Sequence, residues 1–108
     1  MDFKNYSFRA AKTAKYPKEL AIEYTTLGLV SEAGEVAGKV KKVIRDDGNE
    51  MSEEKRLQIL DEVGDVIWYC AMLCRELGYD IGMAASRNID KLESRYSRGV
   101  IGGSGDNR

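Results

Sequence analysis

The sequence contains no histidine. This absence excludes serine and cysteine nucleophile systems that rely on an imidazole base, and it excludes zinc or haem sites with histidine ligands. If the chain is an enzyme, carboxylates, lysine, tyrosine, cysteine or a bound metal must carry out the chemistry. No P-loop and no glycine-rich dinucleotide-binding pattern is present, so phosphate recognition through those loops is excluded as well.

Proline, aromatic residues and net charge are also scarce. Proline occurs once, and aromatic residues make up 8% of the 108 residues, which fits helices better than many short strands. The 17 basic and 18 acidic residues leave a net charge of −1, so the chain as a whole has no net electrostatic attraction to nucleic acid or to an anionic membrane. Apolar residues at 43% and charged residues at 32% are typical of a globular protein. The length predicts a single domain over residues 1–108.

Cysteine is limited to Cys70 and Cys74 in an apolar stretch. They are best explained as small core residues, because two thiols without other soft ligands rarely hold a metal. The N-terminus lacks the apolar core of a signal peptide, and the longest uncharged apolar run, residues 66–74, is too short to span a bilayer. Free thiols without an export signal predict a cytoplasmic protein that does not enter the membrane.

The spacing of apolar residues predicts four helices, at about residues 3–15, 18–45, 53–77 and 81–96. Pro17 stands at the start of the second helix, where its missing N–H is tolerated. Ser52 and Asp80 can cap the third and fourth helices, and Gly78 is a typical helix stop. Short connections favour antiparallel neighbours, so the predicted fold is all-α, a four-helix-type bundle. The glycine-rich tail, residues 98–108, is either disordered or closes over bound phosphate.

Two acidic pairs stand out: Glu32 with Glu35, and Glu62 with Asp65. The members of each pair are three residues apart and share one helix face, in helices that are otherwise apolar around them. Buried carboxylates are unfavourable unless they are paired or bind a metal. Four carboxylates select a hard ion, Mg²⁺ or alternatively Mn²⁺. Taken singly, each acid has a plainer explanation as a solvated charge, with Glu35 paired to Lys39.

Four glycines lie inside the predicted helices: Gly28, Gly34, Gly38 and Gly64. Each costs up to ~1 kcal/mol relative to alanine at such a position. Close approach of two helix backbones, or room for a ligand, would explain them. Close packing alone is an equally good explanation.

The acidic pairs resemble a known signature. The first pair, Glu32-Ala-Gly-Glu35, is followed after a gap of 26 residues by Glu62-Val-Gly-Asp65. This pattern is similar to that of MazG-like all-α nucleoside triphosphate pyrophosphohydrolases. The resemblance continues through Asn-x-x-Lys-Leu-x-x-Arg-Tyr at residues 88–96 and covers residues 20–96 in all. It implies a Mg²⁺-dependent enzyme that cleaves a (d)NTP to a (d)NMP and pyrophosphate.

The resemblance also implies roles for single residues. The implied metal ligands are Glu32, Glu35, Glu62 and Asp65, and the implied substrate-binding residues are Asn88, Lys91, Arg95 and Tyr69. Glu35 is our choice for the catalytic base, because a carboxylate not fully used by the metal can accept the proton of the attacking water. Family members assemble as dimers or tetramers, so we expect a homodimer or homotetramer in which a neighbouring chain completes the bundle.

Two other functions remain open at this point. The first is a non-catalytic nucleotide sensor or helical partner-binding protein on the same scaffold. The second is a phosphoribosyl-ATP pyrophosphohydrolase, since those enzymes belong to the same superfamily. The acidic pairs argue against a mere scaffold, because a scaffold needs no carboxylates on apolar helices.

Overall fold

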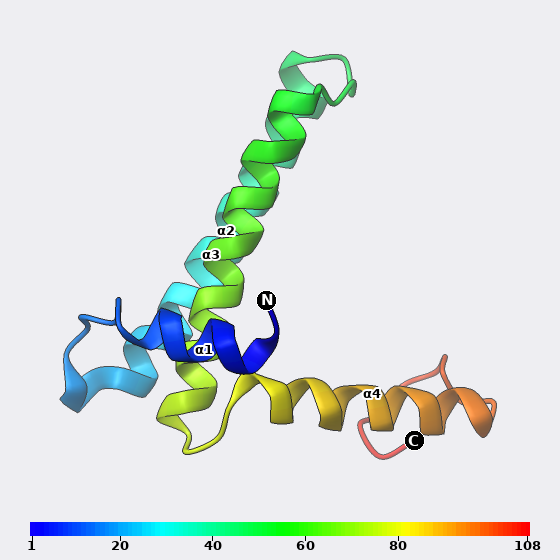
Figure 1. Cartoon of the computed structure of the whole chain (residues 1–108). Helices are drawn as coiled ribbons and strands as arrows, with labels where there is room; N and C mark the ends of the chain where they lie inside the picture. Colours follow the sequence, from blue (N-terminus) through cyan, green and yellow to red (C-terminus); the bar gives the residue numbers. More distant parts are fainter.

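The computed structural model describes residues 1–108 and contains helices but no strands (Figure 1). The elements are α1 (Phe3–Ala11), the short 3-10 turn η1 (Lys18–Leu20), α2 (Ala21–Asp46), α3 (Glu53–Glu76) and α4 (Ile81–Ser97). The prediction of an all-α chain with four helices is therefore confirmed. None of the helices combines the length and the apolar composition needed to cross a bilayer.

The ends of α3 and α4 follow from local sequence. The side chain of Ser52 accepts a hydrogen bond from the Lys55 backbone N–H at 3.1 Å, and that of Asp80 accepts one from the Met83 N–H at 2.8 Å. Both predicted caps are confirmed, and each supplies an acceptor that the first turn of the helix lacks. Gly78 follows α3 with φ +87°, a left-handed conformation that glycine adopts without steric cost.

The first helix ends earlier than its sequence predicts, at Ala11 rather than near residue 15. The hydroxyl of Thr13 donates to the Ala10 carbonyl at 2.7 Å, and the Trp68 indole N–H donates to the Thr13 hydroxyl at 2.9 Å. A contact with α3 thus holds the chain in a turn where the local pattern favours another helical turn. Tertiary contacts of this kind commonly override weak helix propensity.

The helices form an open arrangement rather than a closed bundle. Figure 1 shows α2 and α3 as a long antiparallel hairpin, with α1 lying across its base and α4 extending away from that base. The last helix, α4, packs on α1 and α3 but makes no contact with α2. The radius of gyration is 16.8 Å, whereas a compact chain of this length has about 13 Å. A single chain therefore does not close the predicted four-helix bundle.

The core is correspondingly small. Only eight of the 108 residues are buried, and Ala10, Ala71, Met72 and Ile81 form one cluster where α1, α3 and α4 meet. The hairpin, in contrast, carries large apolar side chains in solvent: the exposed fractions on α2 are 70% for Leu27 and 67% for Val30, and on α3 60% for Leu60. The chain alone leaves this part of its apolar surface uncovered.

Candidate functional site

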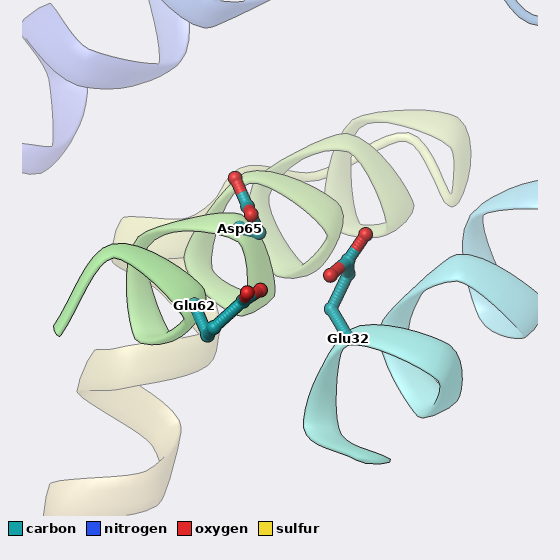
Figure 2. A group of neighbouring side chains, drawn as sticks. All are labelled: Glu32, Glu62 and Asp65. Carbon is teal, nitrogen blue, oxygen red and sulfur yellow. The ribbon is translucent and has the colours of Figure 1, made fainter. Parts of the chain in front are cut away.

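Three of the predicted metal ligands converge between the two long helices. Glu32 comes from α2, and Glu62 and Asp65 come from successive turns of α3 (Figure 2). One carboxylate oxygen from each of the three lies within 4.8 Å of the others. We call this group the acid cluster. The spacing of oxygens suits a single cation shared by all three side chains.

The acid cluster is electrostatically strained by its own charges. Partial burial raises the pKa of the Glu32 carboxyl above its ordinary value, and the negative charges of neighbouring acids, Asp65 first, raise it further. Both effects disfavour the ionised form. A cation placed among the three carboxylates would relieve this repulsion.

A single lysine partly offsets the repulsion among the three carboxylates. The Lys39 Nζ lies 3.6 Å from Glu62 Oε1 across the two helices, and no other lysine or arginine pairs with the acid cluster. This distance is too long for a good hydrogen bond. The pairing of Lys39 with Glu35, considered from the sequence, is not the one formed. One lysine at the edge of three carboxylates leaves an all-oxygen, net negative donor set, which fits Mg²⁺ or Mn²⁺.

Glu35 is the predicted ligand that the structure leaves outside the acid cluster. Its side chain is exposed on α2, and its charge still contributes to the raised pKa of Glu32. Three residues along a helix turn a side chain through about 300°, so Glu35 is offset by about 60° from the direction of Glu32. It therefore lies beside the cluster and is accessible to solvent.

Asn88 and Lys91 are exposed on α4 and line a groove between that helix and the end of α3. The groove does not include the acid cluster. Leu77, the residue that follows α3, lies about 18 Å along the helix axis from Asp65. From there α4 runs away from the hairpin without contacting α2 (Figure 1). One chain alone does not bring these two side chains to its own carboxylates.

Arg95 is buried, with 8% of its surface exposed, and its guanidinium donates to the Asp106 carbonyl at 2.9 Å. The tail is folded against α4 and is held from within by Arg108. The Arg108 guanidinium donates to four backbone carbonyls, those of Val100, Ile101, Gly102 and Gly105. Sequence reasoning missed this role of Arg108 and the use of Arg95 by the tail.

Tyr69 lies one turn beyond Asp65 in a group of four aromatic rings. Its ring centroid is 5.0 Å from that of Trp68 and 6.5 Å from that of Tyr24, and Tyr16 closes the group by stacking on Tyr24 at 5.6 Å. Burial, the Tyr24 hydroxyl and the nearby carboxylates raise the pKa of Tyr69, so its hydroxyl stays protonated. Tyr69 therefore joins the aromatic group to the acid cluster.

Comparison with known proteins shows the family of the chain. Residues 21–100 match the MazG nucleotide pyrophosphohydrolase domain, a region that includes all of α2, α3 and α4. The chain therefore belongs to the MazG family. It is similar to the Gene 37 protein of Mycobacterium phage L5, with 45% identity over 109 residues that cover 95% of this chain and 96% of that protein. That name states no activity. No solved structure matches the chain at a significant level.

Proposed function

We propose that the chain is a Mg²⁺-dependent nucleotide pyrophosphohydrolase that cleaves a (d)NTP to a (d)NMP and pyrophosphate. The observation that carries the proposal is the acid cluster, in which carboxylates from α2 and α3 converge in a member of the MazG family. Glu32, Glu62 and Asp65 would hold the ion, and Mn²⁺ is expected to support the activity in place of Mg²⁺. When bound, Mg²⁺ neutralises charge on the triphosphate and lowers the pKa of water.

Glu35 is proposed as the general base. Its exposed position beside the acid cluster supports this role, because a carboxylate outside the group of ligands can take a proton from water. The oxygen of that water forms a bond to the α phosphorus, the bond from this phosphorus to the bridging oxygen breaks, and pyrophosphate leaves with the electron pair. No histidine is needed for these steps.

Phosphate binding is proposed for α4. Lys91 offers a cationic donor and Asn88 a neutral amide, and their spacing places both on one helix face. Because α4 lies far from the acids of its own chain, we propose that these side chains act on the acid cluster of a second copy. The α2–α3 hairpin also exposes large apolar side chains that a second copy would cover, which supports a homodimer or homotetramer.

The direct test is a panel of (d)NTPs and phosphoribosyl-ATP, incubated with Mg²⁺ or with a chelator, followed by detection of monophosphate and pyrophosphate. We expect both products only with the metal. Asp65→Asn should lower the rate at least about 100-fold, because it replaces a carboxylate ligand of the ion with a neutral, weaker amide oxygen. Asp61→Asn is the matched control, since Asp61 is exposed on the same helix and lies outside the acid cluster.

Three other outcomes are informative. Nucleotide binding without product would favour the sensor that the sequence leaves open. Release of a diphosphate and inorganic phosphate would show that a different bond is cleaved. Equal rates for Asp65→Asn and wild type would overturn the assignment of the metal site.

A further inference from the structure

The four glycines inside the long helices differ in what surrounds them. A β-carbon added to Gly34, Gly38 or Gly64 would meet no atom within 4 Å. At Gly28 it would fall into the ring of Tyr69, 2.5 Å from Cδ1 and closer still to Cε1 and Cζ. Real β-carbons essentially never approach another atom within 3.0 Å, so this ring position requires glycine at 28.

The contact lies directly beside the acid cluster. Gly28 precedes Glu32 by one turn of α2, and Tyr69 follows Asp65 by one turn of α3. Residues four apart share a helix face, so the ring crosses from α3 onto the α2 backbone next to the carboxylates. The rings of Trp68 and Tyr24 pack against Tyr69 and restrict where else its ring can go.

We propose that Gly28 is a positioning residue: without a side chain at this point of α2, the ring of Tyr69, already expected to bind substrate, can lie against the helix beside the acid cluster and is set in place for the nucleoside part of the substrate. The identity of the ligand rests on the proposed function, whereas the position of the ring does not. The ring has an apolar face and a neutral hydroxyl, which suit a base or sugar. The triphosphate, in contrast, is matched by the metal and by lysine.

Gly28→Ala tests the proposal, with Gly34→Ala and Gly38→Ala as matched controls on the same helix. The first readouts need no activity: near-UV circular dichroism and the fluorescence of Trp68, whose ring packs edge-on against Tyr69. We expect both spectra to change in Gly28→Ala and to stay at wild type in the controls. We also expect KM for the nucleotide to rise about tenfold with a smaller change in kcat, while Mn²⁺ affinity stays within about twofold.

A double variant shows whether Gly28 acts through Tyr69. In a Tyr69→Ala background the ring is gone, so adding Gly28→Ala should raise KM no further. If Gly28→Ala alone fails to fold, the double variant should fold, because the clash is removed.

Several results would overturn the inference. They are wild-type spectra in Gly28→Ala, an equal effect of Gly28→Ala with and without the Tyr69 ring, or changed spectra with an unchanged KM. If the wild-type chain cleaves no nucleotide, the proposed function fails, and the two spectra still decide whether Gly28 positions the ring.

Discussion

At the scale of the residue, the acid cluster predicts a stability that depends on pH and on metal. The pKa of Glu32 is raised in the folded chain, so ionised Glu32 destabilises the fold. This effect is absent below the ordinary value of 4.5 and develops as the pH rises through the raised pKa. Without divalent metal, Glu32→Gln should therefore raise the melting temperature at neutral pH and make no difference at about pH 4.

Adding Mg²⁺ at neutral pH should reverse this difference, so that the wild type has a higher melting temperature than Glu32→Gln. In the proposed site the wild type binds the ion through three carboxylates and should gain stability from that binding, whereas Glu32→Gln keeps only two of these carboxylates. Thermal unfolding followed by circular dichroism, with and without Mg²⁺, measures both effects. A Glu32→Gln variant that is less stable than wild type in the absence of metal would contradict the prediction.

Glu35 gives a second prediction at this scale. As a base outside the acid cluster, it should matter to the rate and not to metal affinity. We expect Glu35→Gln to lower kcat by about 10²- to 10⁴-fold and to leave the Mn²⁺ dissociation constant near that of wild type. Calorimetric titration with Mn²⁺ beside steady-state kinetics separates the roles, since a large loss of Mn²⁺ affinity would make Glu35 a ligand instead.

The sequence predicted the acids of the site better than their surroundings. The sequence predicted that Glu32, Glu62 and Asp65 would act together, and the structure brings one carboxylate oxygen of each within 4.8 Å of the others. For Glu62 and Asp65 this follows from their three-residue spacing on one helix. The spacing did not show that Glu35 would lie outside, because that depends on where α3 crosses α2. Similarly, Gly28 was recognised as unusual, but the ring that requires it comes from a distant part of the chain.

At the scale of the element, the tail is a folded segment in which several backbone carbonyls accept hydrogen bonds from one side chain, that of Arg108. Arg108 donates to four carbonyls between residues 100 and 105, so Arg108→Ala should release this segment. We expect amide hydrogen exchange in residues 99–107 to become at least about tenfold faster, with unchanged helix content. Arg87→Ala is the control, because Arg87 is exposed on α4 and is not among the arginines that donate to the tail, which are Arg95, Arg98 and Arg108. Unchanged exchange in Arg108→Ala would show that other contacts hold the tail.

Helix boundaries were predictable where a side chain of the same element sets them. Ser52 and Asp80 cap their own helices, and the sequence identified both. The end of α1 was misjudged because Trp68, from α3, binds Thr13 and stabilises a turn. Local patterns carry no information about such a partner.

At the scale of the whole molecule, the distance of α4 from the acid cluster of its own chain leads to a complementation test. Asp65→Asn impairs the acid cluster and Lys91→Ala impairs α4, and each variant should be inactive alone. If sites are shared between chains, an equal mixture forms hybrids with one intact site, and about a quarter of wild-type activity should return. The light-scattering molar mass should confirm that the chains associate.

The control for complementation mixes Asp65→Asn with Glu62→Gln. Both changes lie in the acid cluster, so no hybrid contains an intact site and activity should stay absent. Failure of the first mixture to regain activity, although hybrids form, would show that each site is built within one chain.

The all-α class was predictable from the spacing of apolar residues, whereas the expectation that a neighbouring chain completes the bundle came only from the family resemblance. An apolar stripe on a helix is satisfied equally well by a neighbouring helix of the same chain or of another. Leu27, Val30 and Leu60 are exposed in the single chain, and the sequence alone does not tell whether a helix of the same chain or of another chain covers them.

The small core has a consequence for how the protein comes to exist in its folded form. A chain that buries eight of its 108 residues has little with which to offset the entropy lost on ordering the rest. With the association proposed above, we predict that folding and assembly are one equilibrium, as in obligate oligomers whose isolated chains are not stable. The midpoint of unfolding would rise with protein concentration, and newly made chains would depend on their own abundance to fold.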